Sequence, residues 1–158
     1  MVEKHTSFIV TGPTASGKSE YAHRLAREHN GVIINCDSVQ IYSGIENISA
    51  SPFAGRTVSD EIDGVPYRLF SILPLSAQIS VADYLQMARR EYDAALASGR
   101  TPIFVGGTGY YMNAIINGIS PMPEISPENR ARAREMVASD LGAARKMLPP
   151  EFTATDPQ

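Results

Sequence analysis

The chain has no tryptophan, one cysteine and no hydrophobic run that approaches the length of a membrane span. Cys36 alone can form neither an internal disulfide nor a cysteine metal cluster, and beside an apolar strand we expect it to be a small buried hydrophobe. The first residues lack the apolar core of a signal peptide, so we expect a cytoplasmic protein without a membrane segment. The net charge of −3 argues against nonspecific coating of nucleic acid, which requires neutralised phosphates.

The most informative motif lies near the N-terminus. Residues 12–19 match the phosphate-binding pattern G-x-x-x-x-G-K-[ST], between an apolar run at 7–11 and a helix-like stretch at 18–29. Its glycines let successive backbone N–H groups point toward a diphosphate or triphosphate. A chance glycine-rich turn is the alternative. The candidate phosphate site comprises Gly12, Pro13, Thr14, Ala15, Ser16, Gly17, Lys18 and Ser19.

Strand and helix signals alternate along the chain. Short apolar runs predict strands at residues 7–11, 32–35, 67–73 and 101–105. Helical spacing or helix-start residues predict helices at 18–29, from Ser80 to Gly99, at 110–117 and at 126–141. Ser80 and Asp83 have the spacing of a capping box. Residues 45–66 show no period and are expected to form a long loop or lid, and 148–158 a linker.

This alternation predicts an α/β fold: a P-loop NTPase-like parallel sheet flanked by helices, with its site at the carboxyl ends of the strands. The pattern changes after two prolines, which predicts a core over residues 1–118 and a separate helical segment over 119–158. Residues 127–146 are the expected place for a polyanion contact, although a solvated helix face is the commoner explanation. Their basic side chains are Arg130, Arg132, Arg134, Arg145 and Lys146.

Two further motifs follow predicted strands. A phosphate loop alone leaves the reaction open, because kinases, GTPases and some transferases share it. Residues 37–42 read Asp-Ser-Val-Gln-Ile-Tyr after the second strand, which places a carboxylate at a strand end close to the loop. Residues 106–111 read Gly-Gly-Thr-Gly-Tyr-Tyr after the strand at 101–105, a second turn that exposes its backbone. Asp37 could accept a proton from a nucleophile or hold Mg²⁺.

The chain resembles bacterial tRNA dimethylallyltransferases, which carry G-P-T-A-S-G-K-[ST], D-S-x-Q-x-Y and V-G-G-T-G-x-Y in this order. All three motifs occur here, at residues 12–19, 37–42 and 105–111, and the resemblance covers about residues 7–140. It implies transfer of a dimethylallyl group from dimethylallyl diphosphate to N6 of the adenosine 3′ of a tRNA anticodon. The implied partners are dimethylallyl diphosphate and a tRNA anticodon stem-loop, with Mg²⁺ as cofactor and a monomer as the complete protein.

The resemblance also implies roles for individual residues. Diphosphate contacts run from Thr14 to Ser19, Lys18 lies at the outer phosphate, and the Ser19 hydroxyl is the metal ligand. Asp37 is the general base, so the catalytic set is Asp37, Lys18 and Ser19. The alternatives are that Gln40 and Tyr42 brace the loop and that Thr108 caps a helix. The implied tRNA contacts are Asp37, Ser38, Val39, Gln40, Thr108 and Arg130.

The chain departs from the family pattern in three places. Tyr67 stands where the family usually has histidine, and the segment at 48–52 lacks the usual basic residue. Family members are also longer, and their later segment returns to the sheet with an arginine that supports the diphosphate. The resemblance therefore implies a truncated member, in which residues 119–158 are the start of a helical insertion that contacts the anticodon stem. Two other interpretations stay open: a P-loop small-molecule kinase that binds ATP, and a non-catalytic phosphate-binding fragment.

Overall fold

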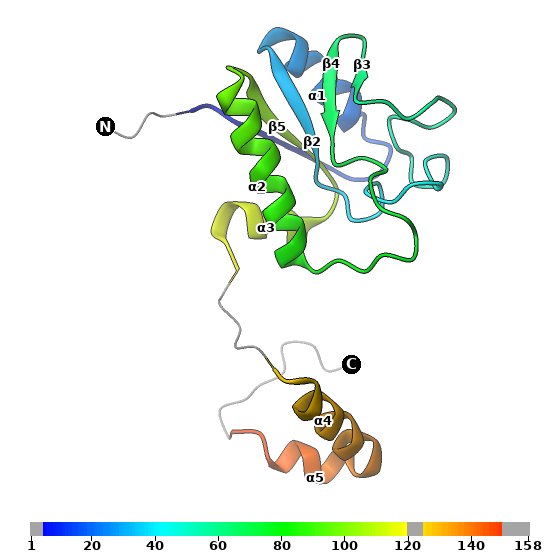
Figure 1. The fold of residues 1–158 in the computed structure, drawn as a ribbon, viewed down its shortest axis with the longest axis vertical. Helices are drawn as coiled ribbons and strands as arrows, with labels where there is room; N and C mark the ends of the chain where they lie inside the picture. Colours follow the sequence, from blue (N-terminus) through cyan, green and yellow to red (C-terminus); the bar gives the residue numbers. More distant parts are fainter. Residues whose placement is uncertain (1–4, 120–124, 150–158) are drawn as a thin grey trace. The chain divides into compact units, whose positions relative to one another are not determined.

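The computed structural model describes residues 5–119 and 125–149 of the chain. Two compact units are distinguished, Met1–Ile119 and Ser120–Gln158. Figure 1 shows a sheet with its helices in the first unit and a helical second unit. No helix in the described ranges is long and apolar enough to cross a membrane.

The first unit is built around one five-stranded sheet. Its strand order is β1-β5-β2-β4-β3, and β1, β5, β2 and β4 run parallel, whereas β3 pairs antiparallel with β4 at the edge. The register places Phe8 and Ile33 beside Ile103 of the central β5. The expected parallel α/β sheet is therefore confirmed. The strands are β1 (Phe8–Thr11), β2 (Gly31–Asn35), β3 (Glu61–Ile62), β4 (Val65–Arg68) and β5 (Thr101–Gly106).

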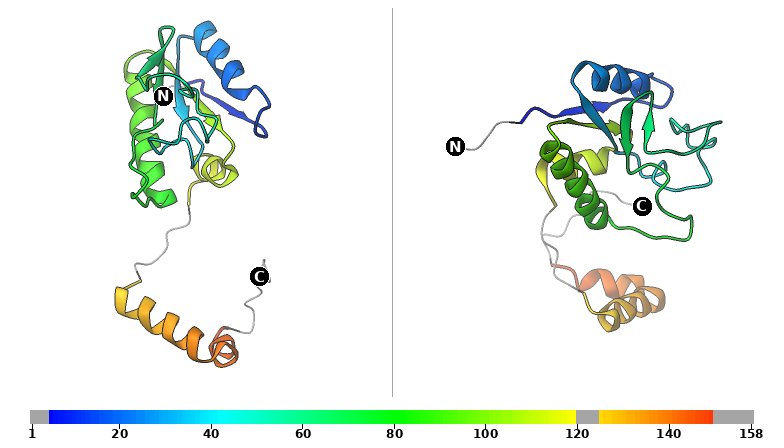
Figure 2. Two further views of the ribbon diagram at one scale, coloured as in Figure 1. Left: turned by 90° about the vertical axis from the view of Figure 1, so that its right-hand side faces the viewer. Right: turned by 45° about the horizontal axis from the view of Figure 1, so that its top comes forward.

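Helices cover both faces of this sheet (Figure 2). The chain passes from β1 to β2 through α1 (Lys18–Glu28) and returns from β4 to β5 through α2 (Val81–Ala97). The first connection moves along the sheet from β1 past β5 to β2, and the second moves back from β4 past β2 to β5. Because both crossovers are expected to be right-handed, these opposite directions place α1 and α2 on opposite faces of the sheet. A third helix, α3 (Gly109–Asn117), follows β5 and packs on the same side as α2.

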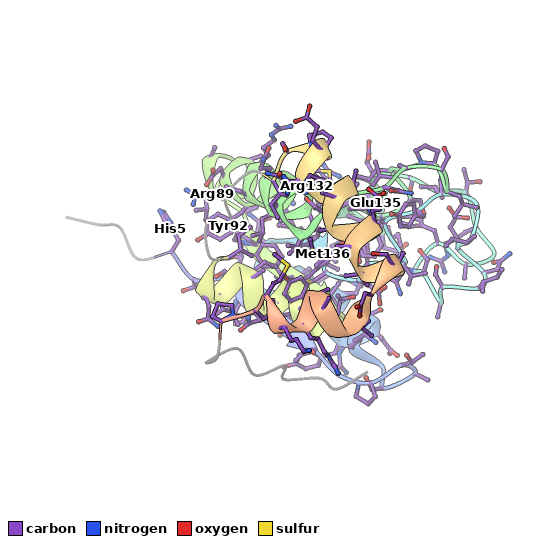
Figure 3. The ribbon with its side chains drawn as sticks, turned by 90° about the horizontal axis from the view of Figure 1, so that it is seen from below. His5, Arg89, Tyr92, Arg132, Glu135 and Met136 are labelled. Atoms are coloured by element: carbon purple, nitrogen blue, oxygen red, sulfur yellow. The ribbon has the colours of Figure 1, made fainter. Side chains whose placement is uncertain are left out.

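The side chains of β2 show how each face is filled. All five of its residues are buried, as a central parallel strand requires. Ile33 packs with Ala22 and Ala26 of α1, whereas Ile34 belongs to the cluster that contains Tyr84 of α2. The sheet thus has a separate apolar core on each face, and the two cores together hold the strand ends in place. On α2, the guanidinium of the exposed Arg89 lies 6.0 Å from the ring centroid of Tyr92, and that ring packs against the core (Figure 3).

Two strand and loop predictions were wrong between residues 45 and 73. The segment at 45–66 is not loop throughout, because β3 and the start of β4 form a hairpin within it. Asp63 and Gly64 connect these strands with φ of 49° and 78°, the left-handed pair that a tight hairpin turn requires. The predicted strand at 67–73 starts earlier and ends at Arg68, because Leu69 and Ser71 also adopt positive φ.

The capping box at the start of α2 is confirmed. The Ser80 hydroxyl accepts a hydrogen bond from Asp83 N at 3.2 Å, and the Asp83 carboxylate accepts one from Ser80 N at 2.8 Å. The hydrogen bonds from the backbone N–H and then the hydroxyl of Ser80 lower the pKa of Asp83. A lowered folded-state pKa means that this stabilisation is present above the ordinary carboxyl pKa and is lost as the pH falls through the folded-state pKa.

We expect Ser80→Ala to lower the free energy of unfolding by about 1 kcal/mol at pH 7, the usual effect of losing an N-cap hydroxyl. Urea denaturation would measure it. Ser80→Thr is the control, because threonine keeps the capping oxygen. Equal stability of Ser80→Ala and the unchanged chain would contradict the prediction.

The second unit contains α4 (Pro127–Ser139) and α5 (Leu141–Lys146). The Ser126 side chain caps α4 by accepting from Asn129 N at 3.2 Å. The predicted helix to about residue 141 ends earlier, because Asp140 leaves the helical conformation and its side chain accepts from Ala143 N to start α5. Arg132 and Glu135 lie along α4 (Figure 3), whose side chains are all exposed except the half-buried Met136. Most of the predicted linker, residues 150–158, lies outside the described residues.

Candidate functional site

The carboxyl ends of β1, β5 and β2 bring the three sequence motifs to one edge of the sheet. Gly12 follows β1, Asp37 lies just after β2, and Gly107 follows β5. A Cβ atom built on Gly107 would lie 3.7 Å from Asp37 Oδ2 and 3.9 Å from the Gly12 carbonyl oxygen. The parallel register therefore turns three segments that are far apart in sequence into one candidate site.

The phosphate loop has the backbone shape that its sequence predicts. Gly17 adopts φ of 78° at the N-cap of α1, and a Cβ on Gly12 would come within 2.9 Å of Ser16 Oγ. Ala15 also takes the left-handed conformation, with φ of 62°, which an alanine seldom adopts. No side chain caps α1, so the N–H groups of its first turn are available to an anion, together with the positive end of the helix dipole.

Lys18 and Ser19 begin α1 directly behind this loop. Lys18 Nζ donates a hydrogen bond to the Pro13 carbonyl at 3.2 Å, which keeps the ammonium group over the loop. Ser19 is half-buried, and Thr14 and Ala15 are exposed. A hollow of about 660 Å³ opens beside the loop, with Lys18 and Arg24 as the cations in its wall. The arrangement offers backbone donors, hydroxyl groups and two cations against the one carboxylate of Glu20, which suits a phosphate group.

The Asp37 carboxylate is held by the turn that follows it. Its Oδ1 accepts hydrogen bonds from Val39 N at 2.9 Å and Gln40 N at 3.4 Å. The side chain is half-buried, and no hydrogen bond to Oδ2 forms with other residues in the described ranges. Oδ2 faces Gly107, at the phosphate-loop end of the site. One carboxylate oxygen is thus anchored while the other is available to a proton or a cation.

Thr108 links the second and third motifs. It occupies the N-cap position of α3, but its side chain forms no capping hydrogen bond. Instead, Thr108 Oγ1 accepts from Ser38 N at 2.9 Å and donates to Ser38 Oγ at 3.2 Å. The interpretation that the Thr108 hydroxyl caps a helix is therefore wrong, because Ser38 takes up that hydroxyl.

Gln40 and Tyr42 lie behind the exposed part of this turn. The Gln40 amide donates to the Ser49 and Ala50 carbonyls at 3.0 and 3.3 Å, so its bracing of the following loop is confirmed. Tyr42 packs against the α2-side core, and its backbone bridges to Leu73. Val39, by contrast, exposes 48% of its surface beside Asp37. Of the expected RNA contacts in this turn, Val39 is thus the exposed side chain, and Asp37 and Ser38 are half-buried.

Arg130 belongs to the second unit. It lies exposed on α4, where it lines a shallow hollow of about 360 Å³ with Arg134, Ile125 and Pro127. Arg130 and Arg134 are exposed four residues apart on α4, and the polyanion contact expected there stays a prediction.

Two buried residues that sequence analysis did not single out lie behind the site. Asn35 and Tyr84 are fully buried, and Tyr84 donates a hydrogen bond to the Asn35 carbonyl at 2.9 Å. Cys36 is also fully buried, as expected, and burial raises the pKa of its thiol to about 11. A Cβ on Gly106 would collide with the Cys36 carbonyl, so β2 and β5 can approach closely here only with glycine. A polar residue at the end of an apolar strand was the available signal for Asn35.

Comparison with known proteins identifies relatives for nearly the whole chain. The family model described as IPP transferase matches residues 40–158, and the one described as isopentenyl transferase matches residues 5–70. A tRNA dimethylallyltransferase of Rhodospirillum rubrum is 45% identical over 86% of this chain and 40% of its own length. One of Methylocella silvestris is 40% identical over 98% of this chain and 48% of its own length. The chain thus spans less than half the length of these curated relatives.

Solved structures show the same fold. The full-length tRNA isopentenylpyrophosphate transferase of Bacillus halodurans superposes with a TM-score of 0.68 and 31% identity, over 94% of this chain and 52% of its own. A eukaryotic dimethylallyltransferase acting on tRNA also superposes with a TM-score of 0.68, at 22% identity, over 94% of this chain and 39% of its own. The second likeness concerns the fold alone.

Proposed function

Because the chain belongs to the IPP transferase family, we propose that it carries out tRNA prenylation: transfer of a dimethylallyl group from dimethylallyl diphosphate to N6 of the adenosine 3′ of the anticodon. The observation that carries the proposal is the convergence of a phosphate loop, a half-buried carboxylate and a glycine turn at one sheet edge. The whole protein's activity, its RNA and its diphosphate substrate are all part of this proposal.

The chemistry follows from the arrangement of these groups. The adenine amine nitrogen forms a bond to C1 of the dimethylallyl group, the C1–O bond breaks, and its electron pair leaves with the diphosphate. The loop N–H groups and Lys18 stabilise the charge that develops on that leaving group. Asp37 accepts the proton that the amine loses, as a general base. The base must leave the stack of the anticodon loop to reach this site, as in other enzymes that act on a nucleobase.

Magnesium is the proposed cofactor, and the residues present offer two oxygen ligands for it, the Ser19 hydroxyl and the Asp37 carboxylate. The described ranges contain no group of three or more His, Cys, Asp or Glu side chains that could hold a metal. A Ser19 hydroxyl on the first turn of α1, with the diphosphate oxygens themselves, would be the ligands that Mg²⁺ prefers. When bound, Mg²⁺ adds positive charge at the leaving diphosphate. Asp37 would be the alternative protein ligand, as a Walker-B-like carboxylate.

The RNA would approach the reacting atoms from the side opposite the diphosphate. We place Asp37, Ser38, Val39 and Thr108 at the target adenosine, with Gln40 holding the turn from behind. The second unit is proposed to begin the helical insertion that contacts the anticodon stem, with Arg130 at a phosphate. A cytoplasmic location and a monomeric complete protein are further parts of this proposal.

The direct test is transfer of label. The purified chain is incubated with labelled dimethylallyl diphosphate, Mg²⁺ and an anticodon stem-loop, and label linked to the base is measured. A chimera continues the chain after Gln158 with the later segment of the Rhodospirillum rubrum relative, since the chain covers 40% of that protein. A stem-loop with guanosine at the target position is the control. Micromolar ATP binding without dimethylallyl diphosphate binding would favour a P-loop kinase instead.

We expect Thr108→Val to lower kcat/KM for the stem-loop about tenfold, the effect of losing one well-placed hydroxyl contact. Valine keeps the shape but leaves Ser38 N without its acceptor, which loosens the turn at the adenosine. Steady-state transfer with the stem-loop as the varied substrate would measure the change. Thr108→Ser keeps the hydroxyl and should stay close to the unchanged enzyme, and a similar loss in both variants would contradict a role for the hydroxyl.

A further inference from the structure

Asn35 ends β2 two residues before Asp37, and it is fully buried. Burying an amide side chain is costly unless its polar atoms are hydrogen-bonded. Within residues 5–119, the Asn35 amide meets that condition through backbone groups around the site, so its contacts are specific to this end of the strand.

The Asn35 side chain brackets the backbone of Asp37. Its Oδ1 accepts from Asp37 N at 2.9 Å, and its Nδ2 donates to the Asp37 carbonyl at 3.0 Å. Because a backbone N–H can only donate, the amide oxygen must face the Asp37 N–H and the amide nitrogen the Asp37 carbonyl. Both backbone groups of the proposed general base are therefore held by one side chain, and the carboxylate has little freedom except about its own side-chain bonds.

The same amide also ties a second strand end to the site. Asn35 Nδ2 donates to the Leu69 carbonyl at 2.9 Å, directly after β4 ends. Leu69 has φ of 62°, so its backbone has left the strand conformation. This third hydrogen bond holds the Asn35 side chain against the end of β4. The position of Asp37 therefore depends on both β2 and β4.

We propose that Asn35 is the positioning residue for Asp37: its buried amide sets the backbone of the proposed base, and thereby where the carboxylate meets the acceptor amine. The proposal rests on the transferase function proposed above. Displacement of a reacting group by about 1 Å can cost about 100-fold in rate. Loss of this bracket is therefore expected to appear in kcat, while the phosphate loop, which Asn35 does not contact, keeps its affinity.

Three variants test the role. Asn35→Leu removes all three hydrogen bonds at similar volume. Asn35→Ser keeps an oxygen that can accept from the N–H two residues later but cannot reach Leu69. Tyr84→Phe is the matched control, because it removes a buried hydrogen bond to the Asn35 carbonyl and leaves the side-chain bracket intact.

The variants are compared in the purified chain or, if only the chimera transfers label, in the chimera. Asn35→Leu should lower kcat about 10- to 100-fold, with KM for dimethylallyl diphosphate changed less than about twofold. Asn35→Ser should recover most of the rate, and Tyr84→Phe should retain it. An equal kcat loss in Asn35→Leu and Tyr84→Phe would overturn the proposal, since it would show a general effect of a weakened core.

A second measurement does not depend on transfer. Hydrogen exchange of the Val39 N–H, which bonds to Asp37 Oδ1, reports whether the turn keeps its shape. Its protection should fall about tenfold in Asn35→Leu and stay unchanged in Tyr84→Phe. Unchanged Val39 protection in Asn35→Leu overturns the proposal whatever the transfer assay shows. Absence of transfer in the unchanged chain and in the chimera, with protection lost as expected, would instead overturn the proposed function and leave the positioning of Asp37 supported.

Discussion

Asp37→Asn is expected to lower the rate of dimethylallyl transfer about 100-fold or more, the usual contribution of a positioned general base. Asparagine keeps an oxygen for the Val39 and Gln40 N–H groups, so the turn is preserved and only the proton acceptor is lost. Binding of dimethylallyl diphosphate should stay within about threefold, because Lys18 and the loop N–H groups provide it. Single-turnover transfer and competition binding on the same preparation would measure both quantities.

The same variant separates the two roles open to Asp37. A carboxylate that holds Mg²⁺ would weaken diphosphate binding and transfer together when it is replaced by an amide. Equal losses in both measurements would therefore contradict the base assignment and indicate a metal ligand. Asp93→Asn is a suitable control, because that carboxylate pairs with Arg89 on the solvent side of α2.

Lys18→Ala is expected to weaken binding of dimethylallyl diphosphate about 10- to 100-fold, the range for losing a charged hydrogen-bond donor to a phosphate. The Lys18 ammonium lies over the loop, bonded to the Pro13 carbonyl, and a diphosphate would compete for it. Alanine suits the first turn of a helix, so α1 should stay folded. Calorimetric or competition binding in Mg²⁺ would measure the loss.

Arg27→Ala is the matched control for Lys18. It removes one positive charge from the same helix, but Arg27 is exposed in the last turn and does not line the hollow beside the loop. Its diphosphate affinity should match that of the unchanged chain. If both variants bind equally well, the cation at this loop does not contact the diphosphate, and the proposed orientation of the substrate is wrong.

The local features of the site were readable from residue types at fixed spacing. Residues 12–19 form a curled loop because glycine stands where the backbone adopts left-handed or crowded conformations. The capping box at Ser80 is equally local, since its partners are three residues apart. The parallel sheet also followed from the alternation of apolar runs and helical periods, because only crossover connections fit that order.

Sequence reasoning failed where backbone conformation, more than residue type, decided the outcome. The apolar residues from Tyr67 to Leu73 look like one strand, but positive φ at Leu69 ends the pleat after Arg68. The hairpin at residues 61–68 does carry a sequence signal, because an Asp-Gly pair such as Asp63-Gly64 is typical of a two-residue hairpin turn. Likewise, Asp140 interrupts a continuous charged helix because its side chain caps the next one.

By itself, the sequence determined that a phosphate loop, a carboxylate and a glycine turn follow three strands, because each motif is contiguous and its chemistry depends on neighbouring residues. Only the tertiary structure decided which hydroxyl and amide groups meet. Thr108 bonds to Ser38 across 70 positions, and Asn35 reaches Leu69 across 34. These contacts depend on the strand order β5-β2-β4 and on the close approach of β2 and β5 at Gly106. Because hydrogen bonds act only over about 3 Å, residue spacing within one segment could not reveal them.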